Sequence, residues 1–143
     1  MKKLPTLKIV SACLAGINCK YDGTNNLCPK IAKMVQNAQA IPVCPEVLGG
    51  LSVPRQSVEI KNNQIISKNG ENFTAQFERG AKVGLKLVQT VGAKEVILKA
   101  RSPSCGFRQI YDGTFSKKLV KGDGVFAKLL KLHNFKIKTE EEI

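Results

Sequence analysis

The sequence predicts an α/β fold: a mostly parallel sheet with helices on both faces, of Rossmann-like type, together with a small hairpin. Short aliphatic segments alternate along the chain with longer segments of helical period, a pattern typical of parallel sheets. The chain has 143 residues, 43% of them hydrophobic, and no segment resembles a linker between domains. We therefore expect a single compact domain over residues 1–143, with frayed ends at 1–5 and 139–143.

The first part of the chain is predicted to contain two strands and one helix. Residues 8–12 are an aliphatic segment that ends at small side chains, and a turn-rich loop follows. A helix is expected over 29–39, because it begins with proline and its apolar residues share one face. Residues 41–46 are the second strand, and the glycine- and proline-rich segment 48–56 is a loop.

The central part of the chain is predicted as a hairpin, a helix and a strand. Residues 58–67 contain two short apolar runs around a pair of asparagines, which is typical of a hairpin. A helix is expected over 71–92, where aromatic and aliphatic residues recur every three or four positions. Gly92 fits the C-terminal cap of this helix, and the apolar segment 95–100 is a buried strand.

The C-terminal part is predicted to contain one more helix and one more strand. Residues 107–124 are expected to be irregular or to form a small hairpin. Asp123 is a favourable N-cap residue, and a helical pattern follows it over 124–133. Residues 135–138 form the last strand.

Composition limits the classes of function. No apolar run approaches the ~18 residues of a membrane span, and the basic N-terminus lacks an uninterrupted apolar segment, so a cytoplasmic location is expected. The net charge of +12 indicates either a solvated, lysine-rich surface or affinity for RNA or another anion. Five cysteines in a reducing compartment favour reduced, metal-bound or catalytic thiols over disulfides.

Three of the cysteines follow three predicted strands. Cys13 comes directly after the first strand, Cys44 ends the second, and Cys105 lies in the loop after the buried strand near residue 98. Parallel sheets bind ligands beyond the carboxyl ends of their strands, so these thiols are expected to meet in one crevice. Cys19 and Cys28, in the intervening loop and at the helix start, are either incidental or a fourth ligand.

Three converging thiolates favour a metal centre. They suit zinc with an open fourth position, or three irons of a cubane iron–sulfur cluster, and the residues alone leave both open. Arg55 and Lys99 lie near the same loops, where they either offset the thiolate charge or are simply exposed. Both are candidate substrate-binding residues.

Candidates for proton chemistry lie beside the cysteines. Glu46 is expected to face the same crevice as a general acid or base, the alternative being a surface glutamate in a turn. Ser102 and Ser104 flank Pro103, and their hydroxyls either bind or relay a proton or satisfy the loop backbone. Ser102 is the freer of the two to reach a substrate.

The tetrapeptide Tyr-Asp-Gly-Thr occurs twice, at 21–24 and 111–114. Asp-Gly is a common turn, so coincidence is one interpretation. The other is a pair of turns that close both sides of one pocket, with Asp22 and Asp112 as candidate substrate-binding residues.

Four blocks of the sequence resemble the thiouracil desulfidase family, long catalogued as a bacterial domain of unknown function. The blocks are SACLAG-x-x-C-K-Y-D-G, V-C-P-E-V-L-G-G-L-x-V-P-R, L-K-x-x-S-P-S-C-G and I-Y-D-G-T-F. They occur in the family's order, and the resemblance runs from about residue 8 to residue 132.

The resemblance implies an α/β domain that holds a [4Fe-4S] cluster through Cys13, Cys44 and Cys105, with the fourth iron open. It implies non-redox removal of sulfur from a small-molecule thiocarbonyl substrate, a thiolated pyrimidine base such as 2-thiouracil or a related compound, with release of sulfide. Glu46 and Ser102 match the positions implicated in proton handling and substrate activation.

Two features keep alternatives open. Arg101 and Ser52 depart from the family's blocks and are expected to alter the substrate pocket, and Cys19 and Cys28 leave open a cluster with four cysteine ligands and no free iron. The alternative function is a basic RNA- or tRNA-binding module, stabilised by a metal or cluster and without catalysis.

Overall fold

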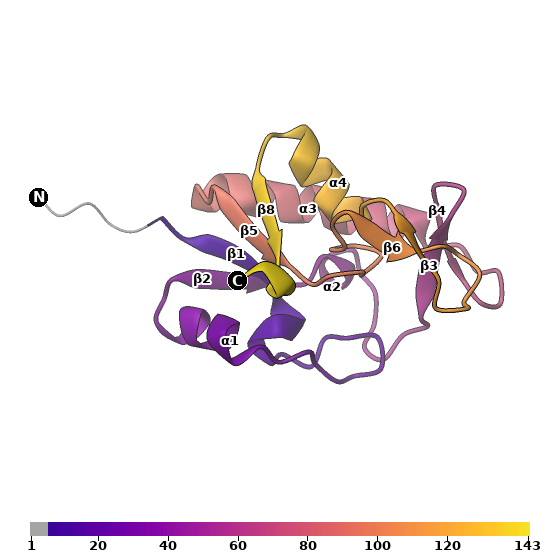
Figure 1. Ribbon diagram of the computed structural model, residues 1–143, viewed down its shortest axis with the longest axis horizontal. Helices are drawn as coiled ribbons and strands as arrows, with labels where there is room; N and C mark the ends of the chain where they lie inside the picture. The colour runs from indigo at the N-terminus through magenta and orange to yellow at the C-terminus, as the bar shows by residue number, and fades with distance from the viewer. Residues whose placement is uncertain (1–5) are drawn as a thin grey trace, which may run out of the picture.

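The computed structural model describes residues 6–143 and is built around a four-stranded parallel sheet (Figure 1). The strands lie in the order β2-β1-β5-β8, and each neighbouring pair is parallel. Their bounds are β1 (Lys8–Ser11), β2 (Ala40–Val43), β5 (Glu95–Leu98) and β8 (Lys136–Thr139). The predicted fold class is confirmed, and the end predicted to be frayed at 1–5 lies outside the described residues.

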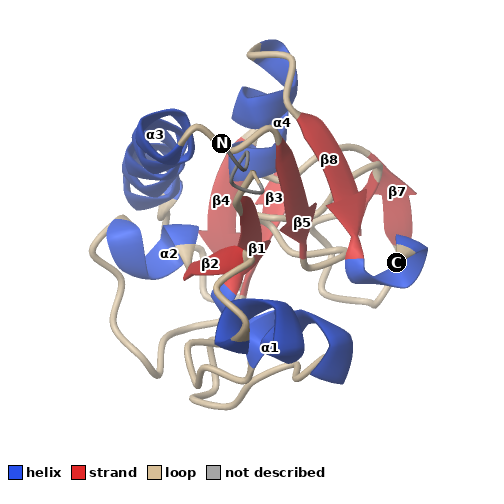
Figure 2. Ribbon diagram, turned by 90° about the vertical axis from the view of Figure 1, so that its left-hand side faces the viewer, coloured by secondary structure: helices blue, strands red, loops and turns tan. Residues whose placement is uncertain are grey.

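Helices cover both faces of the sheet. Figure 2 shows α3 (Thr74–Val91) and α4 (Val125–Leu132) on one side and α1 (Pro29–Gln36) on the other. Because successive strand residues point to opposite faces, the aliphatic runs make both faces apolar. The residues buried with α3 and α4 are Ile9, Val43, Val96, Leu98 and Ile137, and those buried with α1 are Val10, Ala40 and Ile97. No helix among residues 6–143 is long and apolar enough to cross a membrane.

Two antiparallel hairpins lie beyond the carboxyl ends of the sheet strands (Figure 1). One pairs β3 (Val58–Lys61) with β4 (Gln64–Ser67), and the other pairs β6 (Gln109–Tyr111) with β7 (Leu119–Lys121). The Glu59 carboxylate joins them, because it accepts two backbone N–H groups from the loop between β6 and β7. The first predicted hairpin is confirmed, and the region predicted as irregular or hairpin forms the second.

A short helix, α2 (Pro45–Leu48), replaces the end of the predicted second strand and the start of the loop after it. The strand ends at Val43, and proline then takes the first helical position, which it favours. The backbones of α2 and α3 approach very closely. A side chain at Gly49 would meet the Gln76 carbonyl, and one at Gly80 would meet the carbonyl of the first α2 residue. This approach fixes the chain that leaves β2.

The expectation for Asp123 was wrong in one respect. The N-cap of α4 is Gly124, which makes no side-chain cap bond. The Asp123 carboxylate instead accepts the backbone N–H of Arg108 at 2.8 Å, because it stands one residue too early to reach the helix. Asp123 therefore ties the start of α4 to the loop that precedes β6.

The C-terminal residues form a short 3-10 helix, η2 (Glu140–Glu142), where the sequence predicts a frayed end. Thr139 and Glu142 cap it reciprocally: the threonine oxygen accepts the N–H of Glu141, and the Glu142 carboxylate accepts the N–H of Thr139. The capping box orders the chain directly after β8.

Candidate active site

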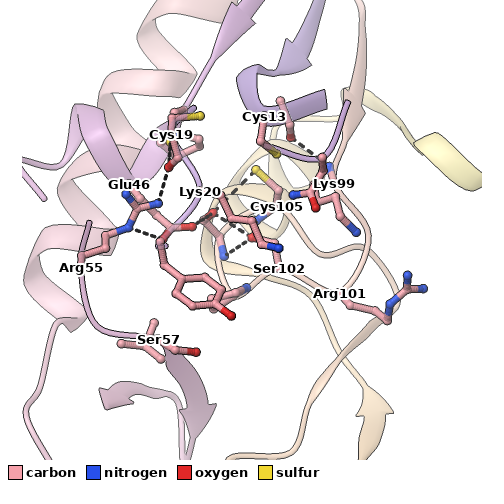
Figure 3. Close-up of a pocket in the computed structure, with 18 of the residues that line it drawn as sticks. Cys13, Cys19, Lys20, Glu46, Arg55, Ser57, Lys99, Arg101, Ser102 and Cys105 are labelled. Atoms are coloured by element: carbon pink, nitrogen blue, oxygen red, sulfur yellow. Dashed lines mark hydrogen bonds and ion pairs between the residues drawn. The ribbon is translucent and has the colours of Figure 1, made fainter. Parts of the chain in front are cut away.

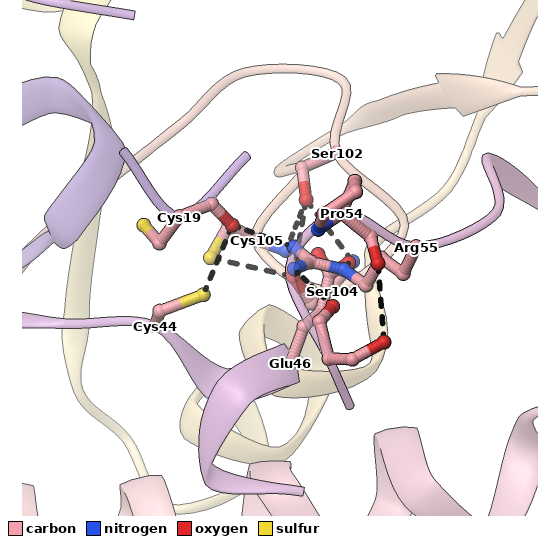
Figure 4. A network of polar contacts seen from close by, with 9 residues as sticks. Cys19, Cys44, Glu46, Pro54, Arg55, Ser102, Ser104 and Cys105 are labelled. Carbon is pink, nitrogen blue, oxygen red and sulfur yellow. Dashed lines mark hydrogen bonds and ion pairs between the residues drawn. The ribbon is translucent and has the colours of Figure 1, made fainter. Parts of the chain in front are cut away.

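A pocket of about 490 Å³ opens at the carboxyl ends of β1, β2 and β5. Three cysteines line it. Cys13 lies in the 3-10 helix η1 (Ala12–Ala15) after β1, Cys44 directly follows β2, and Cys105 lies in the loop after β5. Figure 3 shows the sulfur atoms of Cys13 and Cys105 pointing toward each other, and Figure 4 shows the same for Cys44 and Cys105. The structure therefore brings the three sequence-predicted thiols together.

A fourth thiol lines the same pocket. Cys19 is 7% exposed, and its carbonyl oxygen lies 3.9 Å from the Cys44 sulfur. Cys28 is different, because it packs against the apolar cluster around Ile31 of α1 and does not line the pocket. All five cysteines are free. The sequence left Cys19 and Cys28 equivalent, and only the fold separates them.

Burial and hydrogen bonding set the protonation of these thiols. Burial raises the pKa of Cys13 and Cys105, because it disfavours the thiolate. A hydrogen bond with the Cys19 side chain lowers the pKa of Cys44 to about 7, helped by a backbone N–H and by Arg55. The same hydrogen bond raises the pKa of Cys19. Without a bound cation, Cys44 is the thiol that ionises most readily.

The donor set suits a cluster better than a single metal ion. Within residues 6–143, no three side chains of His, Cys, Asp or Glu approach closely enough to share one ion. Thiolates bound to one zinc at ~2.3 Å stand roughly 3.8 Å apart, whereas each thiolate on a cubane cluster binds a different iron. An all-sulfur set with one thiol from each of three strand ends matches the way a cubane cluster takes one thiolate on each of three irons.

Glu46 is held in the pocket by an ion pair and a hydroxyl group (Figure 4). Its Oε1 pairs with Nε of Arg55 at 3.1 Å, and its Oε2 accepts the hydroxyl of Ser104 at 2.8 Å. The side chains of Arg55 and Glu46 are 8% and 13% exposed. The guanidinium also donates to the carbonyls of Cys19 and Ser52. Glu46 is therefore an oriented pocket carboxylate and not a surface turn residue.

The two serines form a directed hydrogen-bond chain that ends on Glu46. The Ser102 oxygen accepts the backbone N–H groups of Ser104 and Cys105 at 3.2 and 3.1 Å. The two serine oxygens are 3.1 Å apart, and Ser104 donates to Glu46. A serine hydroxyl has one proton and two lone pairs, so the Ser102 proton must point to Ser104 or into the pocket. Ser102 is thus the serine whose proton is available to a ligand.

The repeated Tyr-Asp-Gly-Thr turns present tyrosines to the pocket. Tyr21 and Tyr111 line it, whereas the candidate residues Asp22 and Asp112 do not. Each aspartate accepts the N–H and the hydroxyl of the threonine two residues later, and these bonds lower its pKa. The aspartates stabilise the turns, and the tyrosines are the residues of the repeats that line the pocket. Only the β6 register and the fold of the first loop reveal which one turns inward.

A family model described as 2-thiouracil desulfurase matches residues 9–142. The chain belongs to this family. The family predicted from the four sequence blocks is confirmed, and the matched residues include every pocket cysteine, Glu46 and both serines.

Two proteins are similar to this chain over nearly its whole length. The chain is 40% identical over 145 residues to the uncharacterized protein YbbK of Bacillus subtilis (strain 168), and the alignment covers 94% of this chain and 96% of YbbK. The solved structure of the [4Fe-4S]-dependent thiouracil desulfidase TudS superposes with a TM-score of 0.91 at 34% identity, over 98% of this chain and 93% of TudS. The whole fold, including the hairpins that close the pocket, is shared with an enzyme of this class.

Proposed function

We propose that this chain is a [4Fe-4S]-dependent desulfidase that converts 2-thiouracil, or a closely related thiolated pyrimidine, to the oxygen analogue and sulfide. One observation carries the proposal: three thiols from three strand ends share a pocket with an oriented carboxylate and a serine. Membership of the desulfurase family and the likeness to TudS support the same reaction.

The proposed reaction is a hydrolysis. Water replaces sulfur at the ring carbon, so that C=S and H₂O become C=O and H₂S, with no electron gained or lost. A cluster bound through three thiolates supplies a Lewis-acidic iron that prefers soft sulfur ligands to oxygen. The residues proposed to hold it are Cys13, Cys44 and Cys105. Cys19 lies beside Cys44 as an additional thiol.

Glu46 and Ser102 handle the protons in this proposal. The Glu46 carboxylate has spare lone pairs beyond those used by Arg55 and Ser104, so it can take a proton from the attacking water. The Ser102 hydroxyl can turn its proton from Ser104 toward the pocket, where in this proposal it donates to the charge that develops on the ring. Arg55 keeps the carboxylate in place. Each role uses an atom whose other partners are already fixed.

Two further expectations belong with this proposal. Five free cysteines suit the reducing cytoplasm, which we propose as the location. Binding to nucleic acid, which the net charge of +12 makes the alternative, stays a prediction that a salt-dependent titration with RNA tests.

Anaerobic reconstitution tests the function. The wild type is expected to bind about four irons and four sulfides per chain and to release sulfide and uracil from 2-thiouracil. Glu46→Gln is expected to keep the iron and lose most turnover, because the side chain keeps its shape but cannot take the proton. A fully loaded wild type that turns over no thiolated pyrimidine would refute the proposed activity. Full turnover by Glu46→Gln would refute the role of Glu46 alone.

A further inference from the structure

The C-terminal η2 helix contacts the segment after β5 that forms one side of the pocket. The segment 99–102, which follows β5, lines the pocket, and the carboxylates of η2 lie behind it. One oxygen of Glu140 pairs with Nζ of Lys99 at 2.9 Å, and the other accepts the N–H of Ala100 at 2.7 Å. Both side chains of the pair are mostly buried, with exposures of 21% for Lys99 and 16% for Glu140. A single carboxylate thus fixes a side chain and the backbone beside it.

Arg101, the next residue that lines the pocket, is also held by a glutamate of η2. Arg101 has a φ of +66°, which is uncommon for a residue other than glycine. Its guanidinium meets both carboxylate oxygens of Glu141 at 3.0 Å. Two consecutive glutamates therefore hold the three residues that precede Ser102.

Among the described residues, the contacts of Lys99 leave one N–H group of its ammonium unused. The Lys99 ammonium has three N–H groups, of which one meets Glu140 and one meets the carbonyl of Ala100 at 3.0 Å. Within residues 6–143, no third acceptor contacts it. Lys99 lines the pocket and lies near Cys13 (Figure 3), so the remaining N–H is available to a ligand there.

We propose that Glu140 is a positioning residue: it fixes Lys99 so that the ammonium donates its third N–H to an oxygen of the pyrimidine substrate. This inference rests on the proposed function and adds to it a substrate donor and the residue that orients it. Without Glu140 the flexible lysine side chain samples many rotamers, and binding must then order it at an entropic cost. Glu140 itself touches no substrate.

The test is a double-mutant cycle on cluster-loaded protein, with 2-thiouracil turnover and uracil binding as readouts. Glu140→Gln still offers an oxygen to the Ala100 N–H, so it removes mainly the hold on Lys99. We expect it to raise KM and the uracil Kd about fivefold, with kcat within about twofold and the iron content unchanged. Lys99→Met is expected to raise both about tenfold. The double variant should bind no worse than Lys99→Met, because Glu140 acts only through the lysine.

Glu95→Gln is the matched control. It removes an ion pair between β5 and β8, from Glu95 to Lys138 at 3.4 Å; the Glu95 side chain is 22% exposed and does not line the pocket. It should leave KM and Kd unchanged. Two results would overturn the inference and leave the desulfidase proposal intact. In one, the increases in KM and Kd caused by Glu140→Gln and Lys99→Met multiply in the double variant. In the other, Glu140→Gln has the same KM and Kd as Glu95→Gln. A wild type that binds uracil but turns over no 2-thiouracil refutes the proposed function, and the cycle is then decided on Kd. A loaded wild type that neither turns over 2-thiouracil nor binds uracil refutes both.

Discussion

Substituting Arg55 with methionine tests the electrostatic arrangement on which the pocket depends. The substitution leaves the Glu46 carboxylate in a pocket where its side chain is 13% exposed, without its cationic partner. Breaking a buried ion pair from one side costs about 3–5 kcal/mol. Glu46 keeps the hydroxyl of Ser104 as a donor, so the lower end, about 3 kcal/mol, is expected. For a chain of this length the loss corresponds to a Tm decrease of roughly 6–12 °C.

The assay is urea unfolding of the reduced, cluster-free protein at pH 7, together with a thermal scan. Glu46→Gln in the Arg55→Met background removes both charges, and it should recover at least half of the lost free energy of unfolding. Lys131→Met is the control, because its pair with Asp123 spans 3.7 Å and the lysine is 65% exposed. It should cost less than about 0.5 kcal/mol. A double variant as unstable as Arg55→Met would show that the loss comes from packing and not from the unpaired carboxylate.

Three further predictions concern the thiols and the packing around them. Cys105→Ala should lose most of the bound iron after anaerobic reconstitution, whereas Cys28→Ala, outside the pocket, should keep it; equal iron in both variants would contradict the ligand assignment. Gly80→Ala should lower the free energy of unfolding by about 1–3 kcal/mol in urea, because its methyl group would overlap the carbonyl of Pro45; an unchanged midpoint would contradict the close approach of α2 and α3. In cluster-free protein, iodoacetamide should modify Cys44 first, at a rate that rises with pH to half its maximum near pH 7, because only the thiolate reacts; mass spectrometry locates the site. For Cys44 taken alone, a pKa lowered from 9.0 contributes stability above pH 9 that is lost as the pH falls through about 7, and the raised pKa of Cys19 opposes this contribution.

The meeting of Cys13, Cys44 and Cys105 was predictable because it depends on topology. Alternating strands and helices imply parallel strands, and parallel strands end at the same edge of the sheet. Residues that follow such strands must then lie near one another, whatever the details of packing. The same reasoning placed Glu46 correctly, because it stands two residues after a strand-end cysteine.

Residues on long loops were not predictable in this way. Cys19 and Cys28 lie in the same loop between η1 and α1, yet Cys19 lies beside Cys44 and Cys28 packs against α1. The Tyr-Asp-Gly-Thr repeats signalled turns, but a turn signal does not show which of its side chains points inward. The orientation of Tyr21 depends on contacts far along the chain, including the hydrogen bond that its carbonyl accepts from the backbone N–H of Arg55.

The acidic C-terminus illustrates the limit most clearly. Three consecutive glutamates at a chain end read as a solvated tail, because charge alone does not identify a partner forty residues away. In the fold, β8 pairs with β5 in register, so the residue after Thr139 arrives beside the residues after Leu98. Glu140 and Glu141 then meet Lys99 and Arg101 because the two strands end together. The rule that places the cysteines thus also explains the tail: whatever follows the last parallel strand lies at the same sheet edge as the pocket, and polar residues there are candidates for its support.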